Sequence, residues 1–335
     1  MKQYDIVGCG SVVRRYHAPI LRSLIRRQAI RVHGCYDLSV AAAKEMGSLL
    51  GAQRTGTPDE LGDLRGVDAV LIATPPENHV TFIERYASLG KAVLVEKPFV
   101  GARAEAERVV EISRSQNAPV LVGHFRRYYP ALNVARGFIA QGGLGQVHRV
   151  EATEGGRWSW PTLSRYVIES RLGGVIYDTG SHLLDMVLYV LDADTGLDLP
   201  FEIKDISKVP DTEPSHDCRA EIRLGNAEMG TVLLSFAVSR LEPLAGAIKI
   251  YGDQGTMIIP TAFAPAPFLI QGSEPFALRR PGYEVGPTDA IGCFVLEHEA
   301  FLNAQSGSPS LLSADRFVTL TALLESLGTV ASAVA

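Results

Sequence analysis

Short apolar runs alternate with longer amphipathic segments from Tyr4 to about His124. This alternation is typical of a parallel sheet covered by helices on both faces. Strands are predicted at 4–7, 31–36, 52–55, 69–73, 92–95 and 119–122. Helical periodicity predicts helices at 14–27, 39–50, 79–89 and 103–116. This part of the chain is therefore predicted to be a doubly wound α/β domain.

After Tyr129 the strand patterns follow one another with few helices between them. Strands are predicted at 147–153, 218–224, 230–236, 247–251 and 256–259, and helices at 130–141, 181–191, 290–305 and 314–333. In the second of these strands, apolar residues alternate with charged ones, as in an antiparallel sheet with one buried face. The pattern therefore predicts two domains: the doubly wound domain of residues 1–124 and an α+β domain of residues 125–335. It also allows the C-terminal helix to pack back on the first domain.

Composition supports this division and excludes some classes of partner. The 335 residues amount to roughly two domains at about 150 residues each. The 46% of hydrophobic residues and 21% of charged residues are typical of a folded chain. Because 32 basic residues face 37 acidic ones, the net charge of −5 argues against nucleic acid as a partner.

Four cysteines, Cys9, Cys35, Cys218 and Cys293, lie far apart without a CxxC pair, which favours reduced, buried thiols. The longest uncharged stretch, residues 254–273, contains three prolines and is not predicted to span a membrane. The first residues carry no signal-peptide pattern. We therefore expect a cytoplasmic protein that does not contact a membrane.

Two glycines, Gly8 and Gly10, stand where the first strand turns into the first helix. Glycine at such a turn lets the backbone approach a pyrophosphate while the N–H groups of the helix point at it. Val13 occupies the third position of the GxGxxG pattern, which is usually Gly or Ala. An ordinary tight turn is the alternative interpretation.

Asp37 follows the second strand, where an acid accepts hydrogen bonds from ribose hydroxyls and repels a 2′-phosphate. This favours NAD over NADP. Asp37 as a cap of the next helix is the alternative. Arg14 and Arg15 keep NADP possible because either can reach a phosphate.

Further motifs carry a specific resemblance. They are Ala-Thr-Pro-Pro-Glu-Asn-His at 73–79, Glu-Lys-Pro at 96–98, Arg-Arg-Tyr at 126–128, Gly-Gly-Val-Ile-Tyr-Asp-Thr-Gly-Ser-His at 173–182 and Gly-Asp-Gln-Gly-Thr at 252–256. With the glycine turn, in this order, the chain resembles the glucose-fructose oxidoreductase and inositol dehydrogenase family of NAD(P)-dependent enzymes over almost its whole length.

The resemblance implies a Rossmann domain followed by a domain with a largely antiparallel open sheet. It implies reversible hydride transfer between NAD or NADP and a secondary alcohol or ketone of a sugar, a cyclitol or a modified, even nucleotide-linked, sugar. The cofactor-binding residues expected from it and from the turn are Gly8, Gly10, Ser11, Val12, Asp37, Thr74, Pro75, Asn78, His79, Glu96 and Lys97.

Three residues are candidates for the chemistry. The resemblance implies that Lys97 hydrogen-bonds the reacting hydroxyl; a solvated lysine is the alternative. His182 is the acid/base candidate because imidazole exchanges protons near neutral pH. Asp178, four residues earlier, either contacts substrate or tunes His182, and a helix cap beside a helix-face histidine is the alternative.

Substrate contacts are predicted from two segments. Arg127 and Tyr128 belong to the Arg-Arg-Tyr motif at 126–128, where the two predicted domains join; an interdomain salt bridge with packing is the alternative. Trp158 and Tyr166 belong to an aromatic and arginine-rich segment suited to a sugar face or an anionic group, or to a dimer contact. The histidines show no paired ligand spacing, so no metal is expected.

Other functions stay open. The chain can be a catalytically idle NAD(P)-sensing regulatory protein, since folds outlive activities. It can also be an enzyme of a non-sugar substrate such as an aromatic dihydrodiol. The resemblance further implies a homo-oligomer, a dimer or a tetramer, beside the small-molecule substrate.

Overall fold

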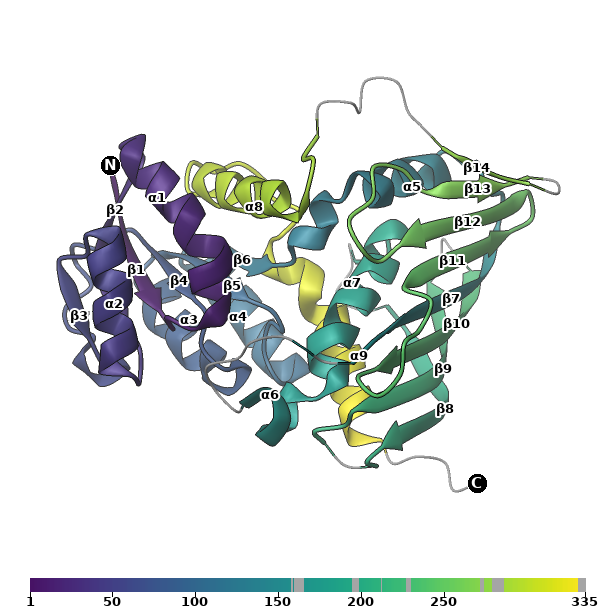
Figure 1. Ribbon diagram of the computed structural model, residues 1–335, viewed down its shortest axis with the longest axis horizontal. Helices are drawn as coiled ribbons and strands as arrows, with labels where there is room; N and C mark the ends of the chain where they lie inside the picture. The colour runs from purple at the N-terminus through teal and green to yellow at the C-terminus, as the bar shows by residue number, and fades with distance from the viewer. Residues whose placement is uncertain are drawn as a thin grey trace. The chain divides into compact units, whose positions relative to one another are not determined.

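The computed structural model describes residues 1–157, 159, 166–194, 199–211, 213–226, 230–271, 274–278 and 286–330. These residues form two compact units (Figure 1). The first unit contains residues 1–123 and 294–315, and the second contains the other described residues. Within the described residues, no helix combines the length and the apolar character needed to cross a membrane.

The first unit is built on a parallel sheet with the strand order β3-β2-β1-β4-β5-β6. Its strands are β1 (Lys2–Val7), β2 (Ile30–Tyr36), β3 (Arg54–Gly56), β4 (Ala69–Ile72), β5 (Ala92–Glu96) and β6 (Val120–Gly123). Strands β4 and β5 are buried along their whole length, as parallel strands covered on both faces should be. The predicted doubly wound domain is confirmed.

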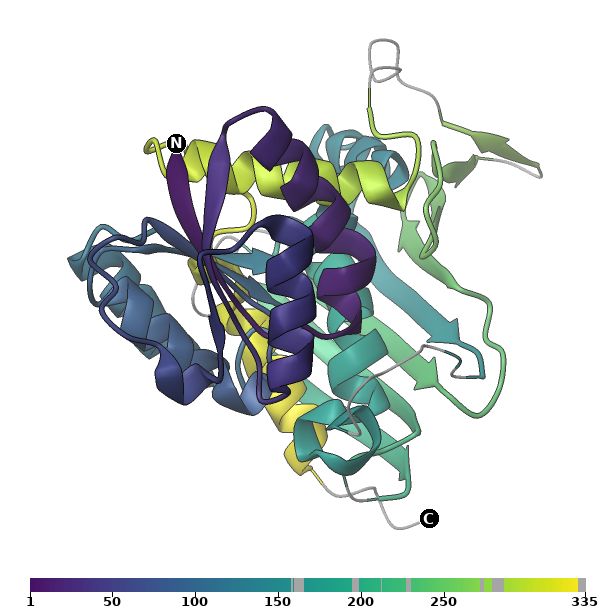
Figure 2. The same ribbon diagram turned by 60° about the vertical axis from the view of Figure 1, so that its left-hand side comes forward.

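The helices of the first unit are η1 (Val13–His17), α1 (Ala18–Arg26), α2 (Val40–Leu50), α3 (His79–Ala87), α4 (Arg103–Ser115) and, from Phe294 on, α8 (Ala290–Ala304), with short 3₁₀ turns η2 (Pro58–Glu60) and η3 (Pro76–Asn78). Helices α1 and α2 pack as one pair and α3 and α4 as another, on the two faces of the sheet (Figure 2). The segment predicted as one helix at 14–27 begins with a π-helical turn at η1, which sequence periodicity does not reveal.

The second unit is built on a sheet with the order β14-β13-β12-β11-β7-β10-β9-β8. Its strands are β7 (Val147–Gly155), β8 (Phe201–Val209), β9 (Asp217–Asn226), β10 (Gly230–Ser239), β11 (Ala247–Gly252), β12 (Gly255–Pro260), β13 (Phe268–Ile270) and β14 (Pro275–Ala277). The pairing is antiparallel apart from the parallel pair β7–β10. The predicted antiparallel character is confirmed.

Helices and helical turns accompany this sheet. They are η4 (Phe125–Tyr128), α5 (Pro130–Ala140), α6 (Tyr166–Glu169), η5 (Arg171–Gly173), η6 (Ile176–Gly180), α7 (Ser181–Val190), η7 (Ala314–Phe317) and α9 (Val318–Thr329). All residues of α7 are buried, because this helix packs against β7, α5 and α9. The alternating apolar residues of β9 are also buried, and the four cysteines are buried and unbridged, as predicted.

Candidate functional site

The glycine turn after β1 has two glycines with opposite surroundings. Gly8 has φ +94°, and a Cβ there would lie 2.4 Å from the Ala73 carbonyl oxygen, so only glycine fits. A Cβ on Gly10 would meet no atom within 4 Å. Gly8 is thus required by the fold, whereas Gly10 leaves open space beside the N-terminus of the helix that begins at Ser11.

Asp37, directly after β2, ties the end of this strand to the glycine turn. Its Oδ2 accepts a hydrogen bond from the Cys9 N–H at 2.7 Å, and its Oδ1 accepts one from the Ser39 N–H at 2.8 Å. The contact with Ser39 lies near the start of α2, the helix that Asp37 was alternatively expected to cap. The residue that caps α2 is Ser39. The half-buried carboxylate therefore stands beside the open space at Gly10.

Arg14 extends from η1 toward α2. Its Nη1 pairs with Glu45 at 2.6 Å, and its Nε donates to the Cys9 carbonyl at 3.2 Å. The Arg14 guanidinium was one of two expected to be able to reach the 2′-phosphate of NADP. Its charge is partly neutralised by the Glu45 carboxylate. Arg15 is exposed and its guanidinium lies 5.8 Å from the centre of the Tyr16 ring.

The loop after β4 is held in place by His79. This side chain is fully buried, with Nε2 2.9 Å from the Thr74 carbonyl oxygen and Nδ1 2.9 Å from the Phe99 carbonyl oxygen. Burial lowers the pKa of His79 despite these hydrogen bonds. His79 thus joins the loops after β4 and β5, while Thr74 and Pro75 are half-buried and Asn78 is exposed.

Glu96 and Lys97 follow at the carboxyl end of β5. Glu96 is 7% exposed; it lies 2.7 Å from His17 Nε2 and accepts the Lys97 N–H at 3.1 Å. Burial disfavours the ionised carboxylate, but His17 and the Lys97 charge outweigh it and lower the pKa of Glu96. The Lys97 side chain is half-buried, and the Lys97–Pro98 peptide bond is cis.

The first unit therefore gathers the turns after β1, β2, β4 and β5 at the carboxyl edge of its sheet. A parallel sheet binds ligands at this edge, where the strand order reverses between β1 and β4. The open space at Gly10, the helix N-terminus and the Asp37 carboxylate fit a dinucleotide with its pyrophosphate over the turn.

In the second unit, Asp178 lies in the π-helical turn η6. Its Oδ2 accepts a hydrogen bond from Arg240 Nη2 at 2.9 Å, and its side chain remains 29% exposed. Arg240 also donates to the carbonyls of Val167 and Gly173. A buried guanidinium therefore holds the segment before Asp178 and balances the charge of this carboxylate.

His182 lies in the first turn of α7, directly after η6, and is 8% exposed. Its ring is packed edge-to-face against Phe125 and His124, with centroids 5.6 and 5.7 Å away. The Nδ1 atom is enclosed by protein. The imidazole is thus held in one orientation by aromatic packing.

Arg127 belongs to a buried ion-pair network. The side chain is 1% exposed and pairs with Asp185 at 2.6 Å and with Asp194 at 2.7 Å. Burial opposes the charge of Arg127, but the two aspartates outweigh it and raise its pKa. The network lies within the second unit, so it corresponds to a packing role of the kind left open above rather than to a bridge between domains.

The neighbouring Arg126 faces a different partner. Its guanidinium forms a two-pronged contact with the Glu154 carboxylate, at 2.7 and 2.9 Å. Tyr128 and Tyr166 are half-buried, and Trp158 lies outside the described residues.

Arg240 and Glu154 were missed by sequence reasoning. Each is a single charged residue at the end of a strand, with a partner far away in the chain. A single charged residue of this kind has no sequence pattern around it that predicts its partner.

The glycine at position 173 is explained by close packing, because a Cβ on Gly173 would lie 2.1 Å from the Tyr166 carbonyl oxygen.

Each of the two units matches a model of a known protein family. A family model described as an oxidoreductase family with an NAD-binding Rossmann fold matches residues 2–124. A model described as the GFO/IDH/MocA C-terminal domain matches residues 132–258. Together the two models cover most of the chain.

The curated relatives of this chain include proteins named as dehydrogenases. Inositol 2-dehydrogenase from Rhizobium meliloti is 29% identical over 192 residues, which are 56% of this chain and 54% of the relative. Trans-1,2-dihydrobenzene-1,2-diol dehydrogenase from Sus scrofa is 26% identical over 247 residues, 72% of this chain and 71% of the relative. The match to the inositol dehydrogenase thus spans about half of that protein.

A solved structure of an inositol dehydrogenase homologue from Azotobacter vinelandii, complexed with NAD⁺, has the same fold. Its TM-score is 0.75 at 21% identity, and the match covers 97% of this chain and 93% of the other. The two family models and this fold agree on both units. The chain therefore belongs to the GFO/IDH/MocA family of oxidoreductases with an NAD-binding Rossmann fold.

Proposed function

We propose that this protein is an NAD-preferring oxidoreductase that transfers hydride between the nicotinamide and a secondary alcohol or ketone of a sugar, a cyclitol or a modified sugar. The observation that carries the proposal is the glycine turn, where a Cβ on Gly10 would meet no atom within 4 Å. This space adjoins a helix N-terminus and the Asp37 carboxylate. Pyrophosphate and ribose need these two groups.

The same residues support NAD rather than NADP. The backbone N–H groups of Ser11 and Val12 would bind the pyrophosphate, and Asp37 would accept the ribose hydroxyls and repel a 2′-phosphate. Arg14 is a weak candidate for binding that phosphate because Glu45 already pairs with it. Thr74, Pro75 and Asn78 are proposed to line the cofactor from the loop after β4.

Lys97 is proposed to act on the reacting oxygen. When bound, the cofactor supplies the carbon that accepts or returns hydride. Removing hydride from a carbinol develops charge on its oxygen, and a positioned ammonium group stabilises that charge. The Lys97 N–H is held by Glu96, which orients the backbone from which the side chain starts.

His182 is proposed to exchange the hydroxyl proton at Nε2, because Nδ1 is enclosed by protein. The aromatic packing around the ring limits its rotation. Asp178 retains an exposed part for a substrate hydroxyl, while Arg240 offsets its charge. We therefore assign Asp178 to substrate positioning.

The named relatives and the aromatic side chains of the second unit support the proposed substrate class. Tyr128 and Tyr166 are proposed to contact substrate, together with Trp158. Because Arg127 is buried in its ion-pair network, we propose that it supports this region through packing. An aromatic dihydrodiol is the second candidate substrate, since one relative named for that activity matches 72% of this chain.

Two substitutions test the catalytic assignment. Lys97→Met and His182→Asn should each lower kcat at least ~100-fold and leave the Kd for NAD within about threefold, because they remove charge stabilisation and proton exchange but spare the nucleotide turn. Matched controls are Lys91→Met, before the start of β5, and His148→Asn, which has a 56% exposed side chain. Wild-type turnover in either test variant would refute its assigned role.

A catalytically idle NAD sensor makes a different prediction. It would bind NAD with the same dependence on Asp37 and Gly10 but turn over none of the candidate substrates. Oligomerisation is likewise a proposal: we expect a dimer or tetramer of this chain, and a sedimentation measurement that finds a monomer at micromolar concentration would contradict it.

A further inference from the structure

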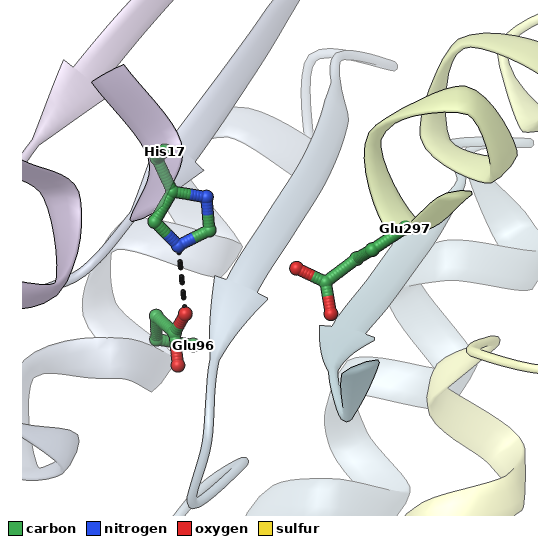
Figure 3. A group of neighbouring side chains, drawn as sticks. All are labelled: His17, Glu96 and Glu297. Carbon is green, nitrogen blue, oxygen red and sulfur yellow. Dashed lines mark hydrogen bonds and ion pairs between the residues drawn. The ribbon is translucent and has the colours of Figure 1, made fainter. Parts of the chain in front are cut away.

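A cluster of ionisable side chains lies inside the first unit. His17 comes from η1, Glu96 from the end of β5 and Glu297 from α8. Figure 3 shows the Glu297 carboxylate pointing from α8 toward the His17–Glu96 pair. The exposed fractions are 0% for His17, 7% for Glu96 and 0% for Glu297.

The hydrogen bonds of this cluster leave one carboxylate unsatisfied. His17 Nε2 lies 2.7 Å from Glu96 Oε1, and His17 Nδ1 lies 2.9 Å from His298 Nε2. Neither oxygen of Glu297 has a hydrogen-bond partner among the described residues. A buried carboxylate without a partner is costly, so this group requires either a proton or a cation.

We propose that His17, Glu96 and Glu297 form a binding site for one divalent transition-metal ion, Zn²⁺ or Mn²⁺. One imidazole nitrogen and two carboxylates suit these ions better than Mg²⁺ or Ca²⁺, which prefer oxygen ligands throughout. A divalent ion would also balance two buried negative charges. Nothing in the proposed hydride transfer uses this ion.

The distances allow the site with small movements. The candidate ligand atoms lie within 4.8 Å of one another. Ligand atoms that share a tetrahedral ion lie roughly 3.4 Å apart, given metal–ligand bonds of about 2.1 Å. To bind one ion, the Glu297 carboxylate must therefore move toward His17 and Glu96 by roughly an ångström. The His17 and Glu96 ligand atoms must move apart by less than that distance.

The residues around the cluster supply the supporting contacts that metal ligands usually have. With His17 Nε2 on the metal, its Nδ1–H would donate to His298 Nε2, which fixes the tautomer. The Glu96 carboxylate is oriented by the Lys97 N–H in the same way.

Without a metal, a proton is the competing occupant. Burial and the nearby Glu96 charge raise the pKa of Glu297 well above its ordinary value. Metal and proton therefore compete for the same carboxylate, as is common at protein metal sites. In either state the cluster links α8 to the helix after the glycine turn and to the end of β5.

Metal content tests the proposal without any substrate. The whole protein is stripped with chelator, loaded with Zn²⁺, desalted and measured by elemental analysis, and Co²⁺ loading is followed by visible absorption. We expect about one ion per chain, a Co²⁺ spectrum of a nitrogen- and oxygen-coordinated ion, and a higher Tm after loading.

Glu297→Gln should lose the bound ion and the Co²⁺ spectrum, and it should fold because the amide resembles the protonated carboxyl. Glu299→Gln, on the same helix but outside the cluster, is the matched control and should retain both. Absence of bound Zn²⁺ and Co²⁺ from the wild-type protein would overturn the proposal and leave the proton as the occupant. Equal metal content in wild type and Glu297→Gln would overturn it as well.

Discussion

Replacing Gly8 and Gly10 separately by alanine tests the proposed nucleotide turn. The two substitutions add the same methyl group two residues apart. At Gly8 the new Cβ would lie 2.4 Å from the Ala73 oxygen and 2.8 Å from the Thr74 nitrogen, on a backbone with φ +94°. At Gly10 it would enter space that holds no atom within 4 Å. We therefore expect Gly8→Ala to lower the stability of the fold and Gly10→Ala to weaken NAD binding.

The magnitudes follow from these surroundings. Positive φ costs a residue with a side chain about 1–3 kcal/mol, and overpacking adds about 1–3 kcal/mol. Gly8→Ala should thus lower the free energy of unfolding by about 2–6 kcal/mol, a large part of the stability of a typical domain. Gly10→Ala should change that free energy by less than about 1 kcal/mol. Its methyl group should weaken NAD binding at least about tenfold, or 1.4 kcal/mol.

Urea unfolding without cofactor measures the first effect, and isothermal titration with NAD measures the second. Gly66→Ala is the matched control because a Cβ there also meets no atom within 4 Å, and it should change neither quantity. If Gly10→Ala bound NAD as tightly as the wild type, the assignment of this turn to the pyrophosphate would be refuted. Unchanged stability in Gly8→Ala would contradict the packing argument.

Three further predictions concern single side chains. Asp37→Ala should weaken NAD binding and improve the relative affinity for NADP, as measured by titration with both cofactors; an unchanged ratio would show that the ribose contact is elsewhere. Arg127→Met should lower the free energy of unfolding by about 3–5 kcal/mol, because it takes the guanidinium from the buried Asp185 carboxylate and leaves Asp194 with the longer contact to Arg316 at 3.3 Å; denaturant titration checks this. In chelator-treated protein, stability should fall as the pH rises above the ordinary Glu297 pKa of 4.5, because its raised pKa makes the folded chain keep a proton that the unfolded chain releases. Glu297→Gln should flatten this slope in thermal unfolding.

The parts of the nucleotide site that could be predicted from the sequence are local in the chain. Apolar runs located β1, β2, β4 and β5, and residues after their ends, such as Gly8, Asp37 and Lys97, therefore fell at the carboxyl edge of the sheet. Strand β8 was not predicted, because few of its residues are buried and its alternation is weak. The π-helical turns η1 and η6 were not predicted either, since they depart from the helical period.

Long-range pairing of charged residues could not be predicted. Arg127 pairs with Asp185 and Asp194 across more than fifty residues of sequence, so its burial leaves no local pattern. The same holds for Arg240 with Asp178 and for Glu297 beside Glu96 and His17. Each of these contacts depends on how distant segments pack within one unit.

The most direct test of the central claim is the absorbance of reduced nicotinamide while the protein, with NAD and separately with NADP, is offered polyols, inositols, aldoses, nucleotide sugars and an aromatic dihydrodiol. Our account predicts that NAD is reduced with one of the sugar or cyclitol classes and that Lys97→Met abolishes the signal. NAD that binds at the glycine turn without being reduced by any compound in the panel would contradict it and favour the sensor.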